Sequence, residues 1–177
     1  AERLEESRAG PRIARVHIDG ADDLVGVGRR IQAHLPGAGR VPDQHVRPGD
    51  LGGLAPLRQR YTLFTNPAGG ILDDLMVTNA GDHLFIIVNA GCKEQDLAHL
   101  RRHLAGACQV EELGDRALLA LQGPAAATVM RRLARVAAEM KFMSAMDLMI
   151  DGIACFVSRS GYTGEDGFEI SAPGHQA

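Results

Sequence analysis

The sequence is short of the side chains on which nucleic-acid binding depends. Its 177 residues include no Trp and two Tyr, and the formal net charge is -3. Proteins that bind single strands stack bases on aromatic rings, and most nucleic-acid binders carry a surplus of Lys and Arg. The composition therefore predicts that nucleic acid is not a partner. Hydrophobic residues make up 45% of the chain, which is enough for a folded core.

Cysteine is also scarce. The three cysteines, Cys92, Cys108 and Cys155, are widely spaced, and no CxxC pair occurs. An odd number of distant cysteines indicates reduced thiols rather than a disulfide framework or a zinc site. His99 and His103 have the spacing of a helical metal pair, but Leu100-Arg101-Arg102 between them supplies no Glu. We therefore predict no metal site.

Long apolar runs are missing, so the sequence predicts no membrane-spanning segment. The N-terminus has no apolar stretch typical of a signal peptide, and Glu2, Glu5 and Glu6 are unlike the acid-poor transit peptides. Together with reduced thiols, these features predict a cytoplasmic location, or the mitochondrial matrix if the source is eukaryotic, and no membrane partner.

Two regions differ in composition. Residues 1–47 hold eight Arg and no Lys and are rich in Gly, Ala and Pro, whereas the remaining chain has a more ordinary mix. In the first region we expect a weak strand at Ala14–Gly20 and a helix at Leu24–His34, and we find no chemical motif. The composition therefore separates an N-terminal segment, residues 1–47, from a folded domain over residues 48–177.

The second region has the hydrophobic periods of both strands and helices. Strongly apolar or alternating runs predict strands at Tyr61–Thr65, Ile71–Thr78, His83–Asn89, Ala117–Leu121, Met149–Ser158 and Gly167–Ser171. The period of Leu97, Leu100 and Leu104 predicts a helix over Lys93–His103, and Pro124 begins a second helix that we expect to run to about Met140. This mixture indicates an α+β fold with antiparallel strands.

The motif Gly69-Gly70-Ile71-Leu72-Asp73-Asp74-Leu75 places two acids inside an apolar strand. Side chains alternate along a strand, so Asp73 and Asp74 are expected to face opposite sides. A carboxylate on the core side costs free energy unless it is paired or used. From spacing alone, a strand edge with two solvated acids is the simpler interpretation.

The motif Ser160–Ile170 (SGYTGEDGFEI) combines glycines with an aromatic and an acid. Glycine lets the backbone approach a ligand closely, and Tyr162 offers a ring face and a hydroxyl group. Glu169 falls in the strand that follows. A Gly-rich hairpin without a ligand is the simpler interpretation of the spacing, and no Lys-Ser or Lys-Thr follows the glycines as in a phosphate-binding loop.

Taken together, the motifs resemble one family, the folate-dependent aminomethyltransferase of the glycine cleavage system (T-protein). Four stretches stand in the order and spacing of that family: Tyr61–Leu75 (YTLFTNPAGGILDDL), Val88–Cys92 (VNAGC), Leu118–Pro124 (LLALQGP) and Ser160–Ile170. The resemblance covers about residues 49–171. The pairing of GGILDDL with GYTGEDGFE makes it specific.

The resemblance implies a fold and an activity. The family's fold is a clover leaf of domains around a folate pocket, and we expect this chain to form part of it, with mixed or antiparallel sheets and flanking helices but without the C-terminal barrel. The family's enzymes move the aminomethyl carbon from the lipoyl arm of the H-protein to tetrahydrofolate and release ammonia. Lipoylated H-protein and the co-substrate tetrahydrofolate are therefore the implied partners.

The resemblance also implies the site residues, by position. Asp74 matches the catalytic acid beside the reacting nitrogens of the pterin, whereas Asp73 is expected to matter much less. The residues matching the folate site are Tyr61, Asn89, Tyr162 and Glu169. A carboxylate such as Glu169 can accept two N–H groups from a pterin edge, and Asn89 can both donate and accept.

Two departures from the family leave alternatives open. Residues 1–47 show no Asp-Val-Ser-His-Met segment, so the resemblance implies a divergent or non-homologous segment there and a partial folate-binding domain over residues 48–177. No Arg-Asp-Ser-Leu-Arg-Leu-Glu-type segment follows Ile170. We therefore expect a fragment that does not catalyse transfer at a useful rate alone. A related tetrahydrofolate-dependent demethylase and a non-catalytic folate-binding protein are the other hypotheses. GYTGEDGFE favours the glycine-cleavage branch, and Ser158–Gly161 before Tyr162 is unlike the Lys-Gly-Cys-Tyr-type motif of iron-sulfur relatives.

Overall fold

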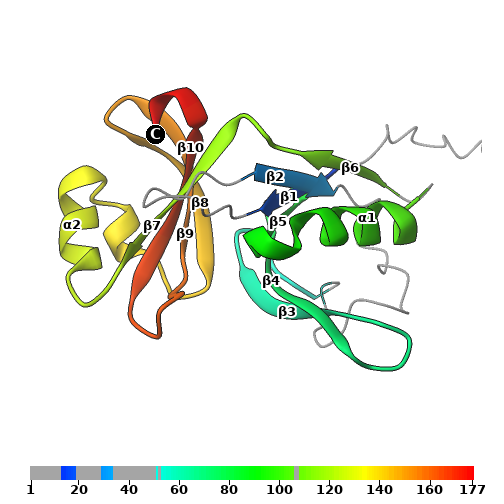
Figure 1. Ribbon diagram of the computed structural model, residues 1–177. Helices are drawn as coiled ribbons and strands as arrows, with labels where there is room; N and C mark the ends of the chain where they lie inside the picture. The colour runs from blue at the N-terminus through cyan, green and yellow to red at the C-terminus, as the bar shows by residue number, and fades with distance from the viewer. Residues whose placement is uncertain (1–12, 19–28, 34–50, 52, 106–107) are drawn as a thin grey trace, which may run out of the picture.

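Two β-sheets stand side by side, each with a helix on its outer face (Figure 1). The computed structural model describes residues 13–18, 29–33, 51, 53–105 and 108–177, of which 13–18 and 29–33 are described as backbone strands. Along the described chain, runs of mostly antiparallel strands are separated by the helices α1 and α2, an order typical of an α+β fold. The prediction of fold class is therefore confirmed.

The first sheet has six strands in the order β2-β6-β1-β5-β4-β3. β1 runs parallel to β5 and β6, and the remaining pairs are antiparallel. The strand predicted near Ala14 is thus confirmed as β1, at the centre of this sheet. The bounds are β1 Ile13–Ile18, β2 Arg29–Ala33, β3 Gln59–Thr65, β4 Ile71–Asn79, β5 Leu84–Val88 and β6 Gln109–Glu112.

The second sheet has four antiparallel strands in the order β7-β10-β9-β8. The bounds are β7 Arg116–Gln122, β8 Ser144–Ile150, β9 Ile153–Arg159 and β10 Gly167–Pro173. The helices are α1 Lys93–His103 and α2 Ala126–Leu133, with the 3-10 turns η1 Ala90–Cys92, η2 Ala137–Glu139 and η3 Gly174–Gln176.

β5 explains how the layers fit together, because all five of its residues are buried. Leu84, Ile86 and Val88 pack against α1, whereas Phe85 and Ile87 face the second sheet. The rings of Phe85 and Phe156 lie 4.6 Å apart at this inner contact. A strand buried on both faces has no need of polar alternation, which is why LFIIV is uniformly apolar.

A short backbone contact joins the two sheets near the site. The amide N–H of Gln59 donates to the carbonyl of Met143 (3.0 Å), and that of Ala145 donates to the carbonyl of Leu57 (2.9 Å). The start of β3 is therefore fixed to the start of β8. This contact brings the segment before β8 next to β3 and β4.

Three sequence-based expectations are wrong in detail. Instead of a helix over Leu24–His34, the structure has strand β2 at Arg29–Ala33, which pairs with β6. Long-range pairing overrides a weak local helix signal interrupted by glycines. Residues 24–28 and 34 lie outside the described residues.

The other two concern turns. The single strand expected at Met149–Ser158 is a hairpin of β8 and β9, whose turn at Asp151-Gly152 has φ of +49° and +78°. Asp-Gly is a sequence typical of this two-residue turn. The second helix ends at Leu133 rather than near Met140, because extended Ala134 redirects the chain. Ala137 and Met140 then pack on the second sheet with Met130.

Candidate folate site

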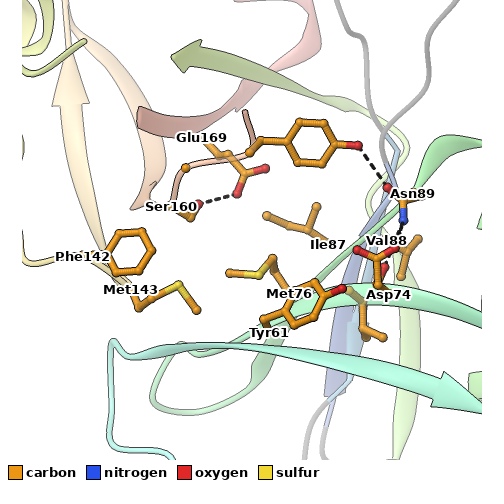
Figure 2. Close-up of a pocket in the computed structure, with 13 residues that line it drawn as sticks. Tyr61, Asp74, Met76, Ile87, Val88, Asn89, Phe142, Met143, Ser160 and Glu169 are labelled. Carbon is orange, nitrogen blue, oxygen red and sulfur yellow. Dashed lines mark hydrogen bonds between the residues drawn. The ribbon is translucent and has the colours of Figure 1, made fainter. Parts of the chain in front are cut away.

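A pocket of about 500 Å³ lies between the two sheets. Its walls come from β3, β4 and β5 of the first sheet, and from the segment before β8, the β9–β10 loop and β10 of the second. All five residues that the sequence singles out for a site line this pocket: Tyr61, Asp74, Asn89, Tyr162 and Glu169. Segments that are more than a hundred residues apart in the chain, such as those of Tyr61 and Glu169, thus meet at one cavity (Figure 2).

Alternation along β4 decides which of the two adjacent acids reaches the pocket. Asp74 and Met76 line it, whereas Asp73 lies on the face that carries Leu75 and Val77 toward α1. Asp74 is partly exposed, and Asp73 is buried. The opposite orientations match what the period of a strand predicts.

Asn89 connects the two carboxyl groups. Its side-chain Nδ2 donates to Asp73 Oδ1 (3.0 Å), to Asp74 Oδ1 (3.0 Å) and to the Asp74 carbonyl (3.1 Å). Its backbone N–H donates to Asp73 Oδ2 (3.2 Å). The Tyr162 hydroxyl donates to Asn89 Oδ1 at 3.4 Å, a long and weak bond. The Nδ2 protons are therefore committed within the protein, and the Oδ1 side is the part of Asn89 that faces the pocket.

Tyr61 forms one wall of the pocket with its aromatic ring, and 55% of its surface is exposed. Its hydroxyl group donates to the Asp74 carboxylate. Desolvation, together with the negative charge of Asp74, raises the pKa of the Tyr61 phenol. The phenol therefore keeps its proton and holds the Asp74 carboxylate from one side, while Asn89 holds it from another.

Glu169 approaches from the opposite wall (Figure 2). Its side chain is buried, and its Oε2 accepts hydrogen bonds from Ser160 Oγ (2.7 Å) and Ser158 Oγ (3.5 Å). A buried carboxylate needs hydrogen-bond donors, and these two hydroxyl groups supply them. Apolar side chains of Met76 and Ile87 lie between Glu169 and Asp74.

The β9–β10 loop carries Tyr162, whose side chain is 68% exposed. The Tyr162 N–H donates to Gln122 Oε1 (3.0 Å), which ties the loop to the end of β7. A Cβ at Gly161 would lie 2.0 Å from the Glu165 carbonyl oxygen, so only glycine fits there. Arg159 closes the loop with a paired contact to Asp166, Nη2 to Oδ2 at 2.6 Å and Nε to Oδ1 at 2.9 Å.

Sequence reasoning missed part of the lining. Ser160 lies inside the recognised motif, but no pattern marked it as the partner of Glu169. Phe142 and Met143 come from an irregular segment without periodicity. Met143 has a φ of +58°, which the sequence does not predict because methionine is not typical of positive φ. Met76 and Ile87 were part of predicted strands, and only their alternation with Asp74 and Val88 could have marked them.

A further acid, Asp96, lies behind the pocket and is fully buried at the start of α1. Desolvation and a hydrogen bond with Asp73 raise the pKa of Asp96 to about 8. Burial acts on Asp73 in the same direction, but the hydrogen bonds from Asn89, Asp96 and Cys92 outweigh it and lower the pKa of Asp73. Burial and the Asp73 carboxylate raise the pKa of the Cys92 thiol.

The pair His99 and His103 has a structural explanation. Their rings stack with centroids 4.4 Å apart, and His99 also packs on Phe64 at 5.0 Å. Within the described part of the chain, no group of three His, Cys, Asp or Glu side chains is placed to hold a metal ion. None of the described helices is both long enough and apolar enough to cross a membrane.

Comparison with known proteins identifies the family of this chain. Residues 36–177 match the GCVT N-terminal domain, and the chain belongs to this family. The glycine-cleavage T-protein resemblance of the sequence motifs is thereby confirmed.

The chain is also similar to individual aminomethyltransferases. The chain is 36% identical over 180 residues to the mitochondrial aminomethyltransferase of Dictyostelium discoideum, covering 96% of this chain and 45% of that protein. It is 44% identical over 163 residues to the human mitochondrial aminomethyltransferase, covering 85% of this chain and 40% of the relative. The crystal structure of glycine cleavage system aminomethyltransferase T from Bartonella henselae matches with a TM-score of 0.74 and 36% identity, over 94% of this chain and 44% of the other. The chain thus spans less than half the length of these relatives.

Proposed function

We propose that this chain contributes the tetrahydrofolate site of an aminomethyltransferase, the enzyme that moves the aminomethyl carbon from the lipoyl arm of the H-protein to tetrahydrofolate and releases ammonia. The observation that carries the proposal is the placement of two carboxylates, Asp74 and Glu169, on opposite walls of one apolar pocket. The relatives' names, which include aminomethyltransferase and glycine cleavage system, support this kind of reaction, and the side chains of the pocket are suited to its chemistry.

The Glu169 wall suits the recognition of a pterin edge. Such an edge presents neighbouring N–H groups, and an anchored carboxylate can accept two of them. Ser160 and Ser158 anchor Glu169 through Oε2, which fixes the carboxylate on this wall of the pocket. The side chains of Met76, Ile87 and Phe142 give the flat ring system apolar surroundings.

The Asp74 wall suits the reacting end. Its carboxylate receives hydrogen bonds from Tyr61 and Asn89, so it is held in one orientation while remaining partly exposed. A carboxylate in that position can stabilise the positive charge that develops on the transferred carbon as ammonia leaves. It can instead move a proton to or from the reacting nitrogens of the pterin. Holding the two large substrates in register accounts for further acceleration.

The proposed reaction also names the partners. Lipoylated H-protein is the proposed aminomethyl donor, and tetrahydrofolate is the acceptor.

A cytoplasmic location, or the mitochondrial matrix in a eukaryote, remains a prediction. The second alternative agrees with the names of the Dictyostelium and human relatives. A domain boundary between residues 47 and 48 likewise remains a prediction.

A chimaera tests the activity. This segment would replace the matching part of a full-length relative, and ammonia release from aminomethylated H-protein would be assayed with tetrahydrofolate. Activity that disappears in the Asp74→Asn chimaera supports the proposal. Folate binding without transfer would support the non-catalytic alternative, and demethylation of a methylated amine would support the demethylase.

A further inference from the structure

Asp96 is a carboxyl group in a place that does not tolerate a charge. It is fully buried, and no N–H or O–H group of the described residues satisfies either of its oxygens. An ionised carboxylate without donors would be strongly unfavourable there. Asp96 therefore holds its own proton, which makes it a hydrogen-bond donor.

The acceptor for that proton is Asp73, whose carboxylate lies within hydrogen-bonding reach of the buried Asp96 side chain. Asp73 Oδ1 and Oδ2 already accept from the Asn89 side chain (3.0 Å) and backbone (3.2 Å). The Asp96 hydroxyl adds a further donor to an ionised, buried acceptor, where hydrogen bonds are strongest. The pair thus shares one proton and one negative charge.

The fixed negative charge on Asp73 in turn fixes Asn89. An amide whose Nδ2 donates to a carboxylate cannot flip without placing its Oδ1 against that carboxylate. In the observed orientation the same Nδ2 also donates to Asp74 Oδ1 (3.0 Å), on the pocket side of the strand. The chain of contacts therefore runs from the core under α1, through Asp73 and Asn89, to the carboxylate that faces the pocket.

We propose that protonated Asp96 is a positioning residue of the folate site: it donates to Asp73 and so fixes the orientation of Asn89 and of the Asp74 carboxylate. This inference rests on the proposed function for its ligand. Asp96 itself does not line the pocket, so its action is indirect.

The proposal carries a pH dependence. Within the described residues, α1 packs on β3, β4 and β5 mostly through apolar side chains, and the titratable groups facing Asp96 are Asp73 on β4 and Cys92 in η1, with Asp74 beyond. Burial and the hydrogen bond with Asp73 raise the pKa of Asp96 to about 8. Above that pH, Asp96 becomes a second anion beside Asp73, and the shared hydrogen bond is lost.

Two variants separate positioning from space filling. Asp96→Asn keeps the size, the neutral state and an N–H donor for Asp73, and it has nothing to ionise. Asp96→Leu keeps the approximate size and the neutral state but has no donor. If Asp96 only fills the core, the leucine variant should perform as well as the asparagine variant, because a buried apolar side chain needs no partner.

The experiment measures tetrahydrofolate affinity of the 177-residue chain and of both variants by anaerobic titration at pH 7 and pH 9. In parallel, the wild-type protein labelled with ¹³C at the Asp carboxyl carbons is titrated by NMR without ligand, and the Asp96 signal is assigned by its loss in Asp96→Asn. We expect wild-type affinity to fall on the order of tenfold between the two pH values, the scale of one lost hydrogen bond to a buried charge. Asp96→Asn should change less than twofold, and Asp96→Leu should be weak at both.

Equal affinity of the leucine and asparagine variants, or an Asp96 signal that titrates near pH 4, would overturn the proposal. A fall with pH that persists in Asp96→Asn would do so too, because it would assign the effect to Cys92 or another group. If Asp96→Leu does not fold, the wild-type and asparagine profiles still decide. Wild-type protein that binds no folate at either pH would contradict the proposed function and with it the role toward folate, whereas the ligand-free titration separately decides where the proton lies.

Discussion

Asp73 and Asp74 are neighbours in the chain, yet their carboxyl groups lie on opposite faces of β4, and both accept a hydrogen bond from the same nitrogen of Asn89. One carboxylate is buried under α1 and the other faces the pocket. Asn89 follows the end of β5, at the point where the chain turns toward α1. Asp73 therefore fixes the orientation of Asn89, and Asn89 in turn holds the Asp74 carboxylate in the pocket.

This arrangement predicts different effects for the two acids. In the chimaera, Asp74→Asn should lower the turnover number by roughly 10²–10⁴, the usual range for a positioned acid or base. Asp73→Asn should act mainly on folate affinity and on stability, because it removes the anchor of Asn89. Steady-state kinetics and a folate titration on both variants separate the effects. An Asp74→Asn enzyme as fast as wild type would remove Asp74 from the chemistry.

Glu169 should matter for affinity more than for turnover. Glu169→Gln replaces one acceptor oxygen with a donor and leaves pterin N–H groups unpaired, which costs about 1–3 kcal/mol. Ser160→Ala is the matched control, because it removes a hydrogen bond to Oε2 and leaves the carboxylate in the pocket. We expect a smaller loss for the serine variant. Calorimetric titration with tetrahydrofolate measures both, and a dissociation constant of Glu169→Gln within twofold of wild type would count against this role.

The Gly-rich loop should be intolerant at Gly161. An added Cβ would meet the Glu165 carbonyl oxygen at 2.0 Å, so the loop must move and carry Tyr162 with it. Gly161→Ala is therefore expected to weaken folate binding. Gly114→Ala is the control, since a Cβ there meets nothing within 4 Å and the position lies outside the pocket lining. Equal folate affinity of the two variants would show that the loop geometry is not required.

Asp96 should also make stability depend on pH. Its pKa of about 8 in the folded state is above the ordinary value of 3.8. The folded state therefore binds the proton more tightly than the unfolded state, and the stabilisation is complete below pH 3.8 and is lost as pH rises through about 8. The slope approaches about 1.4 kcal/mol per pH unit at most.

Urea unfolding of wild type and Asp96→Asn at pH 5, 6, 7 and 8 measures this difference. The free energy of unfolding of the wild type should fall relative to that of the variant across the series. Parallel curves for the two proteins would indicate that Asp96 is ionised in the folded state, against the structure's lack of donors around it.

The sequence predicted the parts of this molecule that depend on local pattern. The strands around Tyr61, Asp74 and Glu169 alternate or are apolar throughout, and the resemblance of their motifs to the T-protein family named five residues that line the pocket. The site roles themselves stay predictions. The residues that were missed depend on long-range geometry: Ser160 is defined by its contact with Glu169, and Asp96 by its burial opposite Asp73.

The failures among the secondary elements have different origins. The hairpin of β8 and β9 has a local signal, Asp151-Gly152, which the prediction of a single strand overlooked. The end of α2 at Ala134 has no such signal, because packing on the second sheet decides there between local alternatives of similar free energy.

The most direct test of the central claim is to map tetrahydrofolate binding on this chain by ¹H–¹⁵N NMR. The account predicts saturable shifts on both walls of the pocket at once, at Asp74 and Asn89 on one side and at Ser160, Tyr162 and Glu169 on the other, and much weaker binding by Glu169→Gln. Absence of saturable shifts at millimolar tetrahydrofolate in the folded protein, or shifts confined to a surface away from these residues, would contradict it.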